Sequence, residues 1–468
     1  VEHKDKRVKI CLCFGGEIQE PVKQQVEGFI RKNSTEKVSF EEWNGDKMAS
    51  LIVKNLLGSE ILPNQSQSLI RKALAMINEP ETSFRYFSKL IRSLWEKSQK
   101  TKDKREKIKI LRQITICFWI LFAWSREEGN LEASYRSGEL ALLFSWDIVK
   151  EYAHDDSKFG LEINRTFVSI VLGFQRISDT YLSEKILPNV GKQLALSVAV
   201  IGSSYVDVNL RLFDVLGRVA CKAIWACWRF LQVKKKGDDT QVIEAECQYL
   251  ADSIILLCNN NPSLKAPLRD DHAIDLSMAF IFLILVGRQK DVNAWLEDVA
   301  NRCIFTLNTE TKYPCILNDY ADLLEHPKTG DSDYKKEVTG GSILYPIICL
   351  FSALLEDQKV FAMVQDIREK HLSHSNFQYW FPDATSEKYF YNNSELHGTT
   401  LSDLPIEKSP VEFLEIIKEE IKELNDCSSL SAAKCGFWPL IFVSCRCYRL
   451  PIPIELIFDL VEVAKSND

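Results

Sequence analysis

Residues 7–16 read RVKICLCFGG, a short apolar run that ends in two glycines and predicts a buried strand followed by a turn. A helix is expected next over 20–32, with Pro21 in its first turn. Residues 37–43, KVSFEEW, predict a second strand, and Gly45-Asp46 opens a second helix. A strand, a helix, a strand and a helix within about 55 residues predict a parallel α/β unit.

This unit is too small to be a complete α/β domain. Two strands alone cannot bury both faces of a parallel sheet. The chain also begins Val1-Glu2-His3-Lys4, without a methionine. We therefore expect residues 1–62 to be the tail of a larger α/β domain whose first half precedes Val1.

From Leu62-Pro63 onward, nearly every segment has the apolar spacing of a helix, as in the FRYFSKLIRSLW stretch of 66–98. Ser409-Pro410-Val411-Glu412 is a strong helix start, because it combines an N-cap serine, a proline at the first position and a glutamate at the third. Further helices are expected over 106–126, 137–154, 160–178, 183–202, 206–233, 240–258, 272–287, 290–305, 343–356, 358–371, 410–425 and 453–465.

The expected fold class is therefore mainly α, with a small N-terminal α/β unit of parallel strands followed by a large α-helical bundle or solenoid. The expected domains are 1–62, a helical domain over 63–236, and 237–468 as a second helical domain or a continuation of the first. Loops are expected over 235–239, 259–270, 308–341 and 380–408.

Composition limits the classes of function. The chain has 468 residues, 58 Lys plus Arg and 65 Asp plus Glu, so its net charge is −7, which argues against a protein that binds nucleic acid over its whole surface. Its 14 cysteines include no CxxC pair, which favours free thiols in a reducing cytoplasm and no zinc site. The longest apolar runs, 114–124, 277–287 and 342–355, predict buried helices rather than membrane spans.

Segment 85–112 is strongly basic, although the chain as a whole is acidic. It holds 11 Lys or Arg residues and three acids. Such a cluster contacts the phosphates of nucleic acid, or it is simply a solvated helical face. The candidate nucleic-acid-binding residues are Lys97, Lys100, Lys102, Lys104, Arg105, Lys107 and Lys109.

The loop over 379–401 is long, polar and aromatic, and loops of this length are more often functional than shorter ones. Its candidate partner-binding residues are Trp380, Asp383, Glu387 and His397. The alternative is a structural loop held by its own aromatic side chains.

Two weak patterns supply catalytic candidates. Glu2 and Lys4 match half of the Asp…Glu-x-Lys set of PD-(D/E)xK nucleases, in which the carboxylate binds Mg²⁺, although a charged linker is the alternative. Arg368 and His374 resemble the Arg-x₄₋₆-His motif of HEPN-type ribonucleases, but a chain of this composition gives about one such match by chance.

Two further clusters have plain structural interpretations. Asp270-Asp271-His272 and Asp275 offer metal ligands, but they precede an apolar helix and are better explained as caps of its N-terminus. Gly340-Gly341-Ser342 opens a helix where backbone N–H groups bind anions. The chain contains no Walker A, Rossmann, G-x-S-x-G or H-E-x-x-H pattern.

The opening block resembles the last part of Mrr-like restriction-endonuclease domains in bacterial conflict proteins. Phe14-Gly15-Gly16 stands where that family has a small-residue turn after a strand, and Trp43 to Ala49, WNGDKMA, stands where a second strand leads into the closing helix. The resemblance covers about residues 7–60. It implies that the catalytic Asp and Glu-x-Lys, with their Mg²⁺, lie upstream of the matched block.

The resemblance leads to three hypotheses of function. The first is the helical sensor or regulatory portion of a prokaryotic antiphage defence protein linked to a nuclease, with DNA, other defence proteins or a second copy as partners. The second is a non-enzymatic helical scaffold for protein assembly. The third is a ribonuclease built on Arg368 and His374.

Overall fold

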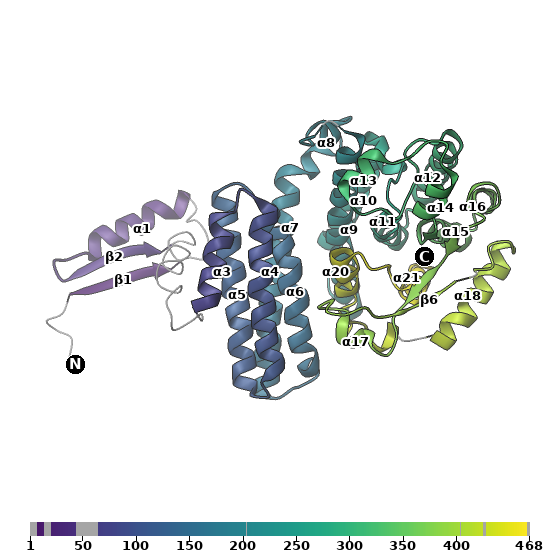
Figure 1. Cartoon of the computed structure of the whole chain (residues 1–468). Helices are drawn as coiled ribbons and strands as arrows, with labels where there is room; N and C mark the ends of the chain where they lie inside the picture. The colour runs from purple at the N-terminus through teal and green to yellow at the C-terminus, as the bar shows by residue number, and fades with distance from the viewer. Residues whose placement is uncertain are drawn as a thin grey trace. The chain divides into compact units, whose positions relative to one another are not determined.

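The computed structural model describes residues 7–13, 20–43, 64–202, 204–402, 404–424 and 427–465, and it divides into two compact units, Val1–Ala141 and Leu142–Asp468 (Figure 1). Most of the described residues are helical, and the strands are short. The mainly α fold class is therefore confirmed. Residue 236, where we expected a domain boundary, lies inside the second unit.

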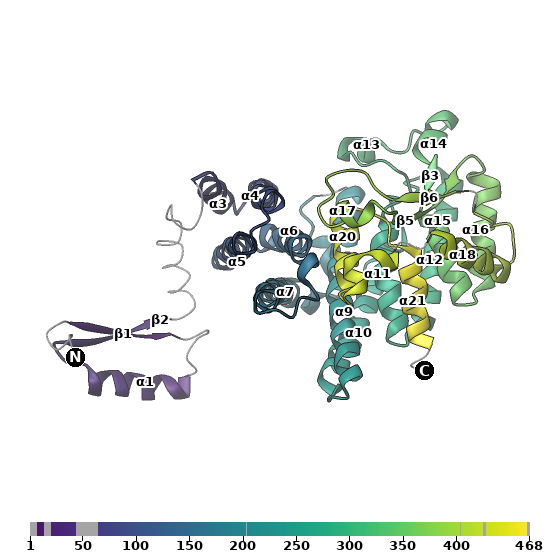
Figure 2. The ribbon, with the colours of Figure 1, turned by 90° about the horizontal axis from the view of Figure 1, so that it is seen from below.

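The predicted parallel α/β unit is confirmed in its first three elements, but the first strand, predicted to be buried, has only exposed and half-buried residues. Strand β1 (Val8–Cys13) is joined through helix α1 (Glu20–Asn33) to strand β2 (Val38–Trp43), and the strands pair in parallel from Val8↔Val38 to Cys13↔Trp43. Helix α1 lies along the strand pair (Figure 2), where Phe29 meets Phe40 edge to face at 5.8 Å. The helix expected from Gly45-Asp46 lies outside the described residues.

Three helices of the first unit pack against one another: α3 (Asn64–Ala75), α4 (Pro80–Lys100) and α5 (Lys104–Glu127). Pro80 is the first residue of α4, where its missing N–H costs no hydrogen bond. The apolar stripes predicted from spacing form the core, in which Phe87, Leu94 and Phe118 are fully buried. Helix α6 (Glu132–Val149) contains the boundary between the two units.

Two apolar helices form the centre of the second unit. Helix α11 (His272–Leu285) contacts α9 (Tyr205–Lys236), α12 (Gln289–Thr309), α15 (Leu344–Leu354), α20 (Pro439–Tyr448) and α21 (Ile454–Lys465). Every residue of α15, and of α11 from His272 to Ile284, is buried. The prediction that the apolar runs at 277–287 and 342–355 are buried helices is confirmed.

Several of the remaining helices follow the predicted spacing closely, although α8 (Ala195–Val198) is much shorter than predicted and α19 (Ser431–Lys434) was not predicted. Ser409 and Glu412 form the predicted reciprocal cap, since the Glu412 N–H donates to Ser409 Oγ at 3.3 Å and the Ser409 N–H donates to Glu412 Oε2 at 3.1 Å. The remaining helices are α7 (Lys158–Lys185), α8, α10 (Gln241–Asn260), α16 (Gln358–His371), α18 (Pro410–Leu424) and α19, with 3₁₀ turns η1 (Lys150–Tyr152), η2 (Leu187–Asn189), η3 (Pro262–Lys265) and η4 (Cys427–Ser429).

The predicted helix break near residue 180 is wrong, and so is the helix predicted over 183–202, where only Ala195–Val198 are α-helical after α7 ends. Helix α7 runs without interruption to Lys185, and two of its polar residues make contacts from within the helix. Asp179 pairs with Lys222 of α9, and Thr180 Oγ1 donates back to the Arg176 carbonyl at 2.8 Å.

Two expected loops contain short regular elements. The 308–341 region holds α13 (Tyr320–Glu325) and α14 (Ser332–Val338), and β3 (Gly341–Ser342) pairs with β4 (Asn376–Phe377). The 379–401 region holds β5 (Tyr379–Phe381), α17 (Ser386–Tyr389) and β6 (Thr399–Leu401), with β5 and β6 antiparallel. Elements this short contain too few residues for a periodic pattern. Helix α20 was also missed by the sequence pattern.

Candidate functional site

The basic residues of 97–109 gather at one end of a helical hairpin. Helix α4 ends at Lys100 and α5 begins at Lys104, so residues 101–103 form the whole connection between two packed helices. Lys97 and Lys100 lie in the last turn of α4, and Lys102 lies in the connection. Lys104, Arg105, Lys107 and Lys109 occupy the first two turns of α5. All seven candidates therefore lie within about two helical turns of the hairpin end, which we call the basic tip.

The basic tip faces solvent. Lys97, Lys100, Lys102, Lys104, Arg105 and Lys109 are exposed, and Lys107 is half-buried. The Lys109–Glu106 pair, at 3.7 Å, joins two side chains that are 58% and 46% exposed. Such a pair stabilises a protein by less than about 1 kcal/mol and leaves the lysine available to a phosphate.

The stability of α5 does not explain its basic first turn. Lys97 and Lys100 lie at the C-terminal end of α4, where the helix dipole favours positive charge. Lys104 and Arg105 lie at the opposite pole, at the start of α5, where each positive charge is unfavourable by about 0.3–1 kcal/mol. Asp103 supplies the cap that keeps this helix start, because its Oδ1 accepts the Arg105 N–H at 2.9 Å. The Asp103 and Glu106 carboxylates offset part of this charge, and the Lys104 and Arg105 side chains are exposed toward the solvent, where an external anion can approach them.

The loop candidates make contacts within the protein. Glu387 Oε1 pairs with Lys150 Nζ at 3.0 Å, and its Oε2 accepts the Ser431 N–H at 2.8 Å, so Glu387 joins η1 to α19. Burial alone lowers the pKa of Lys150, but the Asp147 and Glu387 carboxylates outweigh it and raise that pKa.

Trp380, Asp383 and His397 hold the loop itself. The Trp380 side chain is buried, and its Nε1 donates to the His397 carbonyl at 3.3 Å. Asp383 Oδ1 accepts the Thr385 N–H at 2.9 Å, and His397 Nδ1 lies 3.1 Å from Ser386 Oγ. The structure thus brings these three candidates together, in contacts that fix the shape of the loop.

The two ribonuclease candidates do not share a helix. Arg368 lies in α16, which ends at His371, and His374 follows in the next turn. The Arg368 guanidinium lies 5.1 Å from the centre of the Phe377 ring, and His374 Nε2 lies 2.9 Å from Thr339 Oγ1. This differs from the helical Arg-x₄₋₆-His arrangement that the pattern implies. Glu2 and Lys4, the other catalytic candidates, lie outside the described residues.

Asp270 caps a different helix from the one we expected. Its Oδ2 accepts the Ile343 N–H at 2.8 Å, and its Oδ1 accepts Ser342 Oγ at 2.5 Å and the Leu344 N–H at 3.3 Å. The start of α15, predicted to bind an anion, therefore binds the carboxylate of Asp270.

The capping prediction for Asp271 and Asp275 at the start of α11 is wrong. Asp271 occupies the N-cap position of α11 without a side-chain capping bond, and its Oδ2 instead accepts Arg449 Nε at 2.9 Å. Arg449 Nη1 reaches Asp275 Oδ2 at 3.0 Å. Both carboxylates therefore anchor the segment after α20 to α11.

The pH dependence of stability should report on Asp270. Burial raises the pKa of this carboxyl from 3.8 to about 6, although its three donors lower it. Protonation of Asp270 therefore adds stability that is complete below about pH 4. This protonation-dependent part alone is lost as the pH rises from about 4 to 6, by at most about 1.4 kcal/mol per pH unit, while the hydrogen bonds from Ser342, Ile343 and Leu344 remain. Urea unfolding of the wild type and of Asp270→Asn from pH 4 to 7 measures this loss. We expect the difference in the free energy of unfolding between the two proteins to change with pH across this range. A difference that does not change with pH would exclude a raised pKa for Asp270.

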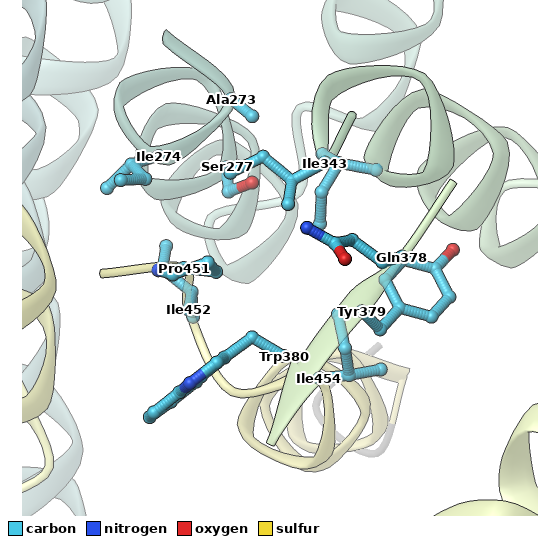
Figure 3. Close-up of a pocket in the computed structure, with 11 residues that line it drawn as sticks. Ala273, Ile274, Ser277, Ile343, Gln378, Tyr379, Trp380, Pro451, Ile452 and Ile454 are labelled. Atoms are coloured by element: carbon cyan, nitrogen blue, oxygen red, sulfur yellow. The ribbon is translucent and has the colours of Figure 1, made fainter. Parts of the chain in front are cut away.

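A small cavity lies between α11, α15, β5 and the segment before α21. Figure 3 shows its walls, with Ser277 and Gln378 among mainly apolar side chains that include Ile343, Trp380 and Ile452. Its volume is about 10 Å³, which is the size of one water molecule. The cavity is therefore too small for a metabolite in this conformation.

The described residues contain no group of three or more His, Cys, Asp and Glu side chains placed to hold a metal ion. Helix α5 is long and apolar enough to cross a membrane, and 61% of its most apolar stretch is buried against the rest of the protein, as in the core helix of a globular fold.

Comparisons of the chain with protein-family models, with curated proteins and with solved structures found no match.

Proposed function

We propose that this chain is the sensor or regulatory portion of a prokaryotic antiphage defence protein linked to a restriction-endonuclease-like nuclease. In this proposal the basic tip contacts the phosphates of DNA, and the helical units control the nuclease or bind other proteins of the system. In this proposal the role of the chain is to recognise DNA and control the nuclease, rather than to cleave DNA itself.

The observation that carries the proposal is the gathering of seven basic side chains at the end of one hairpin in a chain of net charge −7. A local positive surface on an acidic protein directs a polyanion to one place and repels it elsewhere. The resemblance of residues 7–60 to the end of an Mrr-like domain supports the link to a nuclease.

The experiment compares two triple variants with equal changes of charge. Lys100, Lys102 and Arg105 are changed to glutamine in the first variant, and Lys234, Lys235 and Lys236, three exposed lysines at the end of α9, are changed in the control. Fluorescence anisotropy with a labelled DNA duplex measures binding over a range of salt concentrations. Each lost phosphate contact reduces the slope of log K against log salt by about 1, so we expect the tip variant to lose about 3 from the slope.

The control should keep the slope of the wild type. If the slope fell equally in both variants, DNA binding would depend only on the total charge of the protein, and the basic tip would not be the binding site. If the wild type binds no duplex even at low salt, the proposal fails, and the non-enzymatic scaffold becomes the better hypothesis.

A further inference from the structure

Cys435 and His154 meet at the surface of the second unit, although 281 positions separate them in the chain. Cys435 directly follows α19, and His154 lies in the turn between η1 and α7. Cys435 Sγ lies 3.4 Å from His154 Nε2. His154 is exposed and Cys435 is half-buried, so both side chains are open to small solutes.

The two backbones around this pair are held by independent contacts. Glu387 binds Lys150 in η1 and the Ser431 N–H at the start of α19, and therefore fixes the two segments relative to each other. The Gly436 carbonyl, next to Cys435, accepts Trp228 Nε1 at 2.7 Å. Asn164 Nδ2 donates to the Tyr152 carbonyl at 3.1 Å, two residues before His154. The pair is thus preorganised by its surroundings.

The separation of Sγ and Nε2 suits a tetrahedral metal ion. Zn²⁺ binds sulfur at about 2.3 Å and imidazole nitrogen at about 2.0–2.1 Å, which places the two donor atoms about 3.5 Å apart at a tetrahedral angle. The observed 3.4 Å therefore lets one ion reach both atoms without movement of the backbone. Thiolate and imidazole are the ligands that favour zinc over the harder Mg²⁺ and Ca²⁺.

We propose that Cys435 and His154 bind Zn²⁺ as its two protein ligands, with water in the remaining positions. Among the described residues no third His, Cys, Asp or Glu completes the set, so the ion keeps two positions for water, one more than catalytic zinc sites with three protein ligands. The Glu387 carboxylate adds negative charge near the thiol, which favours a divalent cation.

Burial and then Glu387 raise the pKa of the Cys435 thiol, so without metal the thiol keeps its proton and shares a hydrogen bond with His154 Nε2. Zinc binding replaces this proton. The competing explanation of the same geometry is therefore a simple hydrogen bond between Cys435 Sγ and His154 Nε2, and the test separates the two.

The test measures protection of Cys435 by zinc in the whole chain. Iodoacetamide labelling is followed for each cysteine by peptide mass spectrometry, with increasing Zn²⁺ and with Mg²⁺ as the control metal. We expect Zn²⁺ to slow labelling of Cys435 in a saturable way and Mg²⁺ to leave it unchanged. His154→Gln, an exposed substitution, should raise the Zn²⁺ concentration needed for half-protection by at least about 10-fold, the smallest loss typical even of residues that only support metal ligands.

Cys13, the exposed thiol of β1, is the internal control, since His154→Gln should leave its response to zinc unchanged. Comparing each protein with and without zinc removes any effect of the substitution on the intrinsic reactivity of the thiol. Lack of zinc protection at Cys435 in the wild type, or equal protection in His154→Gln, would overturn the proposal and leave the pair as a hydrogen bond.

Discussion

Replacing Asp270 by alanine should destabilise the second unit by about 3–5 kcal/mol. The substitution leaves three donors at the start of α15 without their acceptor: Ser342 Oγ and the N–H groups of Ile343 and Leu344. Each buried donor without a partner costs about 1–3 kcal/mol, and removing the charged carboxylate recovers part of this because its burial is itself unfavourable. Helix α15 is buried along its whole length, so solvent has little access to the position of the lost acceptor.

Chemical denaturation at pH 7 measures this loss as a shift of the unfolding midpoint. Asp333→Ala is a suitable control, because Asp333 is an exposed aspartate whose contact with Lys336, at 3.4 Å, lies at the surface. The control should change stability by less than about 0.5 kcal/mol. If Asp270→Ala were equally mild, the carboxylate could not be the cap on which α15 depends.

Replacing Gly217 by alanine should destabilise the protein by about 2–4 kcal/mol, although the same change elsewhere in a helix is favourable. Gly217 lies within α9 against α11, and a methyl group there would overlap Asp275 Oδ1 and lie 3.0 Å from Arg446 Nε. Asp275 is buried and pairs with Arg449, so it cannot move without breaking that ion pair. The glycine therefore allows two helices to approach around a buried charge.

The matched control for this substitution is Gly191→Ala in the same unit, where the added methyl group would have no atom within 4 Å. Thermal unfolding of the two variants should separate them by several degrees, with Gly191→Ala close to the wild type. A Gly217→Ala protein as stable as the wild type would mean that Asp275 and Arg446 reposition freely, contrary to the packing described here.

Several features of the fold were predictable because their causes are local. The cap at Ser409 and Glu412 depends on residues three apart in the chain, and it forms as predicted. The parallel pairing of β1 and β2 follows from a strand, a helix and a strand in succession. The uniform apolarity of α15 predicted its complete burial. The basic tip was visible for the same reason, since its residues are neighbours in sequence.

The contacts that define the interior of the second unit were not predictable in this way. Asp270 was expected to cap the helix that follows it, yet it caps α15, whose first residues lie more than 70 positions later. Glu387 was a candidate for binding a partner, but it joins η1 to α19. Nothing in the local sequence pattern distinguishes an acidic side chain that faces solvent from one that caps the N-terminus of a helix distant in the chain.

The sequence by itself determined most of the helical segments, the burial of the most apolar ones and the place where positive charge gathers, because periodicity, capping and charge act between residues close in the chain. Only the tertiary structure decided that Cys435 meets His154, that Asp270 meets α15 and that Gly217 meets Asp275. These contacts arise from the packing of helices against α11 and α15, and packing depends on the shapes of all the surfaces at once rather than on any one segment.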